Sequence, residues 1–279
     1  MSTVFDDRTC LLGEGPLWHP ERRQLFWFDI LNRRLLSRDN GTPHTWQFGE
    51  YVSAAGWVSR SELLIASQSK LFLFDLETEA SSKVCDLEAD DAVTRSNDGR
   101  ADPKGGFWIG TMGINVEKAA GAIYRFHKWE LRKLFDGVTI SNAICFSPDG
   151  RTAYFADTAT QVIQKVALDP DGWPSGTPET FVDLTSGDLN PDGAVVDSDG
   201  YLWNAQWGAG RVARYAPDGR FVEEIKLPAS QITCPAFGGD DLKTLFATSA
   251  AEGLSGEVDG KTWLTEAAVR GQIEHRVVL

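Results

Sequence analysis

The chain has 279 residues, 42% of them hydrophobic, and a formal net charge of −13 at pH 7. A strongly acidic surface repels nucleic-acid phosphates and anionic lipid, so we expect neither a nucleic acid nor a membrane among its partners. The four cysteines lack the short paired spacing of a thiolate metal site and are typical of reduced thiols: Cys10, Cys85, Cys145 and Cys234.

Residues 1–10 lack the apolar core of a secretory signal, and no apolar run of the sequence approaches the length needed to cross a bilayer. These features predict a cytoplasmic protein. We expect a monomer or a weak homo-oligomer whose partner is a small molecule.

Six short apolar segments recur along the chain, each with an apolar or aromatic pair that ends on a small or polar residue. They are 26–29, 63–66, 107–110, 154–157, 202–205 and 245–248. Steps of 37 to 48 residues separate them, which matches the roughly 40–50 residues of a four-stranded propeller blade. Turn sequences between them, such as Pro-Asp-Gly at 148–150, supply the positive φ of tight hairpins. The sequence therefore predicts an all-β protein, a six-bladed β-propeller in which residues 1–279 form a single domain.

The two ends of the chain carry weaker signals. The first residues are expected to pair into the last blade and so close the ring. The segment 260–269 is the best helix candidate, although it is short. Residues from Gly256 onward contain no motif that indicates a role.

Four polar residues each lie five positions before the turn that ends an apolar run: Glu14, Asn97, Asn142 and Asp192. If every run is the same strand of a repeated unit, a closed ring points these four side chains at a common axis. Small residues, Ala54 and Thr233, occupy the equivalent positions of the other two units. Two carboxylates and two amides near one axis predict an oxygen-lined metal site in the central channel.

Taken singly, each of these residues is more often a strand cap than a metal ligand. The shared offset favours the metal site, because two carboxylates buried near one axis without a cation would be strongly unfavourable. Oxygen ligands select Ca²⁺, Mg²⁺ or Mn²⁺, and they can also hold Zn²⁺ or Fe²⁺. None of the four histidines is paired at metal-binding spacing or placed beside a nucleophile elbow, which argues against Ser-His-Asp hydrolysis.

Five segments of the sequence carry a family resemblance. They are Leu-Gly-Glu-Gly-Pro-Leu-Trp at 12–18, Arg-Ser-Asn-Asp-Gly-Arg-Ala-Asp at 95–102, Gly-Thr-Met at 110–112, Ile-Ser-Asn at 140–142 and Pro-Asp-Gly at 191–193. In this order they resemble the segments of the senescence marker protein (regucalcin)/gluconolactonase family. The resemblance implies a six-bladed propeller that hydrolyses sugar lactones with one divalent metal ion in its central channel.

The resemblance also implies roles for individual residues. Glu14, Asn142 and Asp192 match the metal ligands of the family. Arg95 and Asn97 match its substrate-binding pair, and Glu117 falls where the family places a further substrate contact on a lid-like loop. In the mechanism that we expect, the metal ion polarises the lactone carbonyl, and Asp192 accepts the proton of the attacking water as the catalytic base.

We expect the substrate to be an aldono-1,4- or 1,5-lactone of a pentose or hexose, which is hydrolysed to the aldonic acid. Arg95 and Asn97 suit sugar hydroxyls rather than long acyl chains. Trp18 and Trp207 are expected near the same rim, where they could pack on a sugar face.

Two other functions remain open on the same propeller. One is a metal-dependent esterase or organophosphate hydrolase, which would share the ring but need a more apolar mouth. The other is a non-catalytic calcium-binding regulator, which would bind the ion without turnover.

Overall fold

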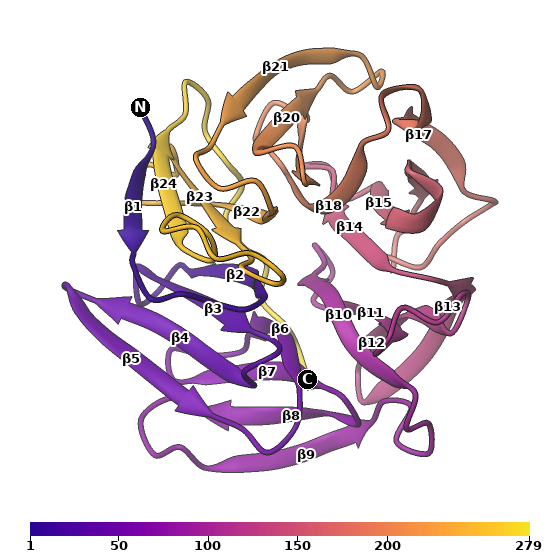
Figure 1. Ribbon diagram of the computed structural model, residues 1–279. Helices are drawn as coiled ribbons and strands as arrows, with labels where there is room; N and C mark the ends of the chain where they lie inside the picture. The colour runs from indigo at the N-terminus through magenta and orange to yellow at the C-terminus, as the bar shows by residue number, and fades with distance from the viewer.

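The computed structural model describes residues 1–279 as six four-stranded antiparallel sheets arranged in a ring (Figure 1). The predicted fold class is confirmed: the protein is a six-bladed β-propeller. The only helical segments are two three-residue 3₁₀ turns, so the structure holds no helix that could span a lipid bilayer.

In each blade the first strand is the innermost and the last is the outermost. Blade one consists of β2 (Gly13–His19), β3 (Gln24–Asp29), β4 (Arg34–Asp39) and β5 (Thr42–Gln47). Blade two consists of β6 (Val52–Trp57), β7 (Glu62–Ser67), β8 (Lys70–Asp75) and β9 (Ser81–Asp86). Blade three consists of β10 (Thr94–Ala101), β11 (Phe107–Gly113), β12 (Gly121–His127) and β13 (Glu130–Val138).

Blade four consists of β14 (Ser141–Phe146), β15 (Thr152–Asp157), β16 (Val162–Ala167) and β17 (Glu179–Asp183), with η1 (Thr158–Thr160) after β15. Blade five follows η2 (Thr185–Gly187) and consists of β18 (Asn190–Val196), β19 (Leu202–Trp207), β20 (Arg211–Tyr215) and β21 (Phe221–Lys226). Blade six consists of β22 (Ile232–Gly238), β23 (Thr244–Ser249), β24 (Thr262–Glu266) and β1 (Thr3–Asp6).

The six apolar segments of the sequence all lie in the second strand of a blade, where both faces of the sheet are covered by neighbouring blades. Trp108 and Trp203 hold the same position in β11 and β19, and both are buried. Trp108 packs edge-on against Phe146 of the next blade, with ring centroids 5.5 Å apart. Trp203 meets Phe237 of its next blade in the same way at 5.7 Å. These repeated aromatic contacts join adjacent blades into a rigid ring.

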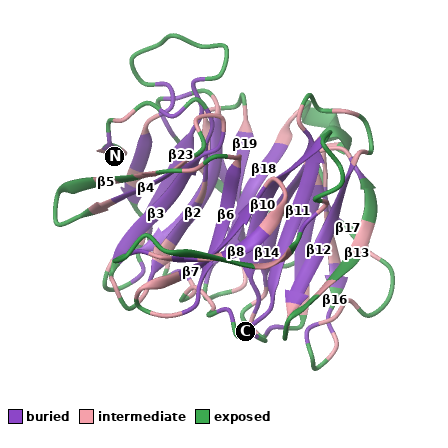
Figure 2. Ribbon diagram, turned by 90° about the horizontal axis from the view of Figure 1, so that it is seen from below, coloured by how far each residue is buried: buried purple, intermediate pink, exposed green.

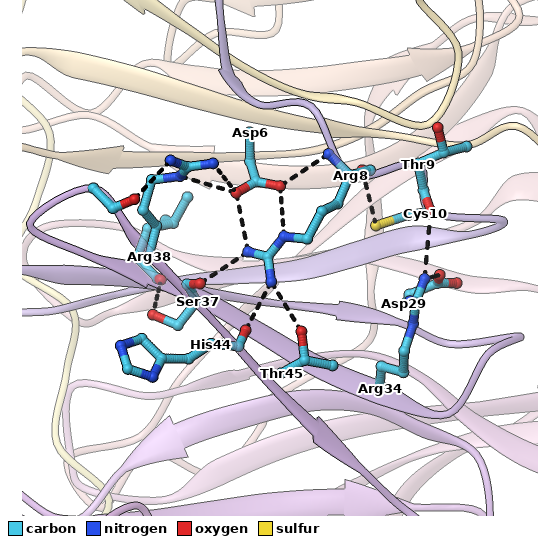
Figure 3. A network of polar contacts seen from close by, with 12 residues as sticks. Asp6, Arg8, Thr9, Cys10, Asp29, Arg34, Ser37, Arg38, His44 and Thr45 are labelled. Atoms are coloured by element: carbon cyan, nitrogen blue, oxygen red, sulfur yellow. Dashed lines mark hydrogen bonds and ion pairs between the residues drawn. The ribbon is translucent and has the colours of Figure 1, made fainter.

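The ring closes as the sequence predicted, because β1 from the N-terminus pairs antiparallel with β24 of blade six (Figure 1). Arg8 then joins the N-terminal segment to blade one (Figure 3). Its Nε donates to Asp6 at 2.8 Å, its Nη2 donates to the Ser37 carbonyl at 2.8 Å, and its Nη1 donates to the His44 carbonyl at 2.8 Å. Arg38 of blade one also donates to Asp6 at 3.0 Å. The carboxylate of Asp6 therefore links the last blade to the first.

The segment 260–269, the best helix candidate of the sequence, is not a helix, since Thr262–Glu266 forms strand β24. Its Thr-Trp-Leu-Thr sequence is β-branched and aromatic, and Trp263 is buried opposite Ala247 of β23. Pairing on both sides, with β23 and β1, outweighs a weak local helix preference.

The two ends of the channel differ. The innermost strands all begin at one end, which is open, whereas the C-terminal segment 270–279 crosses the end where they finish. The Gln272 side chain donates to the Val196 carbonyl at 2.9 Å, and the Val277 N–H donates to the Trp57 carbonyl at 2.9 Å. Figure 2 shows the C-terminus at one end of the ring. We refer to these as the open end and the closed end.

Candidate active site

A cavity of about 400 Å³ lies at the open end of the channel. Its polar wall comes from five blades and consists of Glu14, Arg95, Asn97, Asn142, Thr158, Asn190, Asp192 and Glu252. Its apolar wall consists of Leu12, Leu31, Met112, Ile114, Val116, Ile140, Ala159 and Trp207. All four ring residues of the sequence analysis thus meet in one cavity, whose size suits a small-molecule ligand.

Irregular strand pairing aims the ring residues at the cavity. The pairing register shifts immediately after Glu14 in β2 and after Asn142 in β14, and the corresponding shifts in β10 and β18 span Asn97 and Asp192. Gly15 next to Glu14 has a φ of 53°, and a Cβ there would meet the Ser53 carbonyl at 2.2 Å. Bulges of this kind re-aim a side chain out of the regular alternation, and at Gly15 only glycine fits.

Glu14 and Asp192 form a buried pair of carboxyl groups without a cationic hydrogen-bond partner. Each accepts one backbone N–H, from Gly15 at 3.0 Å and from Gly193 at 3.1 Å. Burial, and then the charge of Asp98, raises the pKa of Glu14 to about 8. Burial, and then the charge of Glu14, raises the pKa of Asp192 well above its ordinary value. A cation bound between them would relieve this repulsion.

Thr158 fixes the orientation of the Asn142 amide. Its hydroxyl donates to the Pro191 carbonyl at 2.7 Å and accepts from Asn142 Nδ2 at 2.9 Å. Because Nδ2 is held there, Oδ1 of Asn142 faces the ring, where Asn97 Nδ2 donates to it at 3.3 Å. An amide oxygen directed at the channel is the donor that a hard cation requires. The sequence analysis missed Thr158, although it directly follows the apolar segment 154–157.

Arg95 has two donor groups at the cavity wall that make no hydrogen bond within the protein. Its Nη1 donates to the Ser96 carbonyl at 2.9 Å and to Asn97 Oδ1 at 2.8 Å, whereas Nε and Nη2 have no protein acceptor. Burial lowers the pKa of Arg95 to about 10, partly opposed by the charge of Glu14, so the guanidinium stays protonated at neutral pH. Its free donors can bind ligand oxygens.

Asp98 lies deeper in the channel and was not predicted, although it follows Asn97 directly. It is buried, and its Oδ2 accepts the Ile144 N–H at 2.7 Å. Burial raises the pKa of Asp98 to about 6, partly opposed by that hydrogen bond and by Arg100. The charge of Asp98 adds to the negative potential around Glu14 and Asp192.

Two predicted residues lie outside the cavity wall. Glu117 turns back into its own loop, where it accepts the N–H and the amide group of Asn115, both at 3.0 Å. Its role as a substrate contact stays a prediction. The expected position of Trp18 is wrong: it lies four residues beyond Glu14 along β2, about 13 Å towards the closed end, and stacks on Phe246. Trp207 does line the cavity.

The structure holds no group of three or more His, Cys, Asp or Glu side chains placed for a metal ion. The predicted ligand set brings only two such residues, Glu14 and Asp192, with the amide oxygen of Asn142 as the third donor. An all-oxygen set with two carboxylates fits a hard divalent cation, since the ion would neutralise the pair.

The fold and this cavity define a class of protein, a six-bladed propeller with an acidic, amide-bearing pocket at one end of its channel. A family model described as SMP-30/Gluconolactonase/LRE-like region matches residues 12–251. The chain belongs to this family, as the sequence motifs indicated.

Individual relatives agree with this assignment. A Rhizobium meliloti protein named as a sugar lactone lactonase is 40% identical over 272 residues, which cover 94% of this chain and 92% of the relative. A 6-deoxy-6-sulfogluconolactonase of Pseudomonas putida is 37% identical over 88% of this chain and 86% of its own. The crystal structure of the calcium-binding protein regucalcin from Agrobacterium tumefaciens superposes with a TM-score of 0.97 at 40% identity, covering 100% of this chain and 98% of that one.

Proposed function

We propose that this protein is a lactonase that hydrolyses a sugar lactone to the aldonic acid, with a divalent metal ion held by Glu14, Asn142 and Asp192. The observation that carries the proposal is the buried Glu14–Asp192 pair, which has no cationic hydrogen-bond partner and faces a cavity of ligand size. The lactonase names of its relatives agree with this interpretation.

The bound ion would act as a Lewis acid on the lactone carbonyl. Asp192 is the general base: its carboxylate accepts a proton from the water whose oxygen forms the new bond to the carbonyl carbon. The bond between that carbon and the ring oxygen then breaks. Asp192 returns the proton to the leaving alkoxide, so that the products are a carboxylic acid and a hydroxyl group.

Other wall residues bind and orient the sugar. Arg95 directs its free Nε and Nη2 donors to hydroxyl oxygens, and it holds the Asn97 side chain in place through Oδ1. Trp207 offers an aromatic surface for the apolar face of the sugar ring. Glu117 is retained as a proposed substrate contact; to reach the cavity its carboxylate must leave Asn115, while its neighbour Val116 already lines the wall.

The test is a panel of aldono-1,4- and 1,5-lactones with an aryl ester for comparison. Acid release is measured with metal-stripped protein and again after Ca²⁺, Mg²⁺, Mn²⁺ or Zn²⁺ is restored, and spontaneous hydrolysis is subtracted. We expect turnover of at least one sugar lactone that returns with metal, and a much slower aryl ester. A faster aryl ester would favour the esterase alternative, and metal binding without any turnover would favour the calcium-binding regulator.

A further inference from the structure

Glu252 is a charged residue at the mouth of the cavity that the proposed chemistry does not use. It follows β23 as the second residue of a tight turn, in which the Leu254 N–H donates to the Ala251 carbonyl at 3.0 Å and Gly253 has a φ of 71°. The base of the turn is fixed, because the Ala251 N–H donates to the carbonyl groups of Cys10 at 3.1 Å and Leu11 at 3.2 Å, in the segment between β1 and β2. The backbone therefore holds Glu252 at the rim.

The Glu252 carboxylate is free to act on a ligand. The side chain is exposed and lines the cavity, and it takes part in no hydrogen bond or ion pair within the protein. Only its backbone carbonyl is used, as the acceptor of the Gln231 side chain at 3.3 Å. A structural role for the carboxylate is thus absent, and its charge faces the mouth.

The charges of the cavity wall are few. When Glu14 and Asp192 are ionised as metal ligands, they and Glu252 contribute three negative charges, and Arg95 contributes the only positive charge, so that the wall without the ion carries −2. A divalent ion bound by Glu14 and Asp192 would bring the wall to neutrality. The remaining charges of the wall are then the positive charge of Arg95 and the negative charge of Glu252. The charge of Glu252 is one of those that partly offset the lowering of the Arg95 pKa.

We propose that Glu252 is a specificity-determining residue, which selects uncharged sugar lactones over lactones that carry a second, anionic group such as a carboxylate or sulfonate. This inference rests on the proposed function of the cavity. With Glu252 present, the metal-loaded wall is neutral, so it exerts no net electrostatic attraction on an anionic group of the lactone. Without it the wall carries +1, and an anionic group is attracted to Arg95.

The test uses two lactones that differ only at carbon six: an aldono-1,4-lactone with a CH₂OH group and the aldaro-1,4-lactone of the same ring with a carboxylate. The kcat/KM of each is measured with metal-loaded wild-type protein and with Glu252→Gln and Glu252→Lys. The kcat/KM of the aldarolactone divided by that of the aldonolactone should rise about three- to tenfold in Glu252→Gln and further in Glu252→Lys. Added salt should reduce this rise.

Glu257→Gln is the matched control, because Glu257 is an exposed acid of the same loop that does not line the cavity. The ratio of kcat/KM for the two lactones in Glu257→Gln should equal that of the wild-type protein. An unchanged ratio in both Glu252 variants, or an equal rise in Glu257→Gln, would overturn the inference. Absence of turnover of the neutral lactone by wild-type protein is a different result, since it refutes the proposed function instead.

A binding measurement distinguishes failure of the inference about Glu252 from failure of the proposed lactonase function. Calorimetric titration of metal-loaded protein with the aldonate and with the aldarate compares the same neutral and anionic groups without any turnover. Glu252→Gln should strengthen aldarate binding relative to aldonate binding by a similar factor. Equal changes for both ligands would contradict a role for Glu252 in charge selection.

Discussion

Buried carboxylates occur at both ends of the propeller, but the two that face the channel at the open end, Glu14 and Asp192, have no arginine hydrogen-bond partner, unlike those at the closed end. Asp102 accepts from Arg125 Nε at 2.7 Å, with both side chains fully buried. Asp197 accepts from Arg214 Nη2 at 2.8 Å, and Glu274 of the C-terminal segment pairs with Arg100. At the open end, Glu14 and Asp192 have only each other and backbone N–H groups.

This difference separates stability from chemistry. A buried ion pair whose partners are both present satisfies its own charges and needs nothing further. Burial raises the pKa of the two carboxyl groups that lack an arginine partner, and these groups remain available to bind a cation. The arginine pairs of the closed end therefore stabilise the ring, whereas Glu14 and Asp192 at the open end remain available to bind a cation. Substitutions at the open end should change turnover, and substitutions at the closed end should change stability.

Asp192→Asn should abolish most of the activity and leave the fold intact. The amide keeps an oxygen donor but cannot accept a proton, so kcat should fall by about 10²–10⁴-fold, the usual scale of general base catalysis. The melting temperature of the metal-free variant should equal or exceed that of the wild type, because one of two repelling carboxylates is gone. Turnover with the metal site saturated, together with thermal melting, measures both. Asp199→Asn, an exposed residue of the same blade, is the control, and near wild-type turnover in Asp192→Asn would move the base elsewhere.

Glu274→Ala should show the opposite behaviour. Removal of this carboxylate leaves Arg100 buried without an ion-pair partner, which should lower the free energy of unfolding by about 3 kcal/mol. The kcat per folded molecule should not change, since the pair lies at the closed end. Chemical denaturation and turnover at a temperature where the variant is folded give both quantities. Glu130→Ala breaks an exposed pair with Arg132 and should leave stability nearly unchanged; equal losses in the two variants would contradict the account.

Arg95→Ala should act on substrate affinity. Hydrogen bonds from a charged donor contribute about 1.5–3 kcal/mol, so KM should rise about 10- to 100-fold, with a smaller change in kcat. Its melting temperature should change little, because Arg95 pairs with no carboxylate through a hydrogen bond. Steady-state kinetics with the lactone of the panel that the wild-type protein hydrolyses fastest measures both KM and kcat. A fall in kcat at constant KM would instead show that Arg95 interacts with the substrate only in the transition state.

The metal-free protein should lose stability as the pH rises. The pKa of Glu14 is about 8 in the folded state against an ordinary value of 4.5, so the folded state keeps a proton that the unfolded state has released between these values. The stabilisation is complete below pH 4.5 and is lost as the pH rises through 8. Melting temperatures across this range in chelator should fall by a few degrees, and saturating divalent metal should remove the fall. Glu14→Gln should flatten the profile of the metal-free protein, and an unaltered slope in this variant would assign the effect to other groups.

Much of the open end could be predicted from sequence because its signals are local. The repeat period located the second strand of every blade, and the five-residue offset brought Glu14, Asn97, Asn142 and Asp192 to one cavity. Thr158 and Glu252 lie outside that pattern and were not predicted. Thr158 acts by orienting the Asn142 side chain, and Glu252 is held at the rim by a turn that hydrogen bonds to residues 10 and 11, which are distant in the sequence.

The closed end was hardly predicted, for physical reasons. The C-terminal segment binds to the exposed carbonyl groups of strands in several blades, and such contacts leave no periodic trace in the sequence. Trp18 was misplaced because its position along β2 was ignored, and each residue of a strand advances about 3.3 Å along the channel. The ambiguous segment 260–269 is a strand and not a helix because pairing with two neighbouring strands decides the conformation of so short a segment.

The central claim is that the unpaired carboxylates of the open end hold a divalent cation. Crystals soaked in Mn²⁺ and measured for anomalous scattering test it most directly. The account predicts one strong peak per chain, within about 2.0–2.6 Å of oxygen atoms of Glu14, Asn142 and Asp192, and loss of that peak in Asn142→Ala or its marked weakening. A peak only at the rim beside Glu252, or no peak in the channel at saturating Mn²⁺, would contradict it.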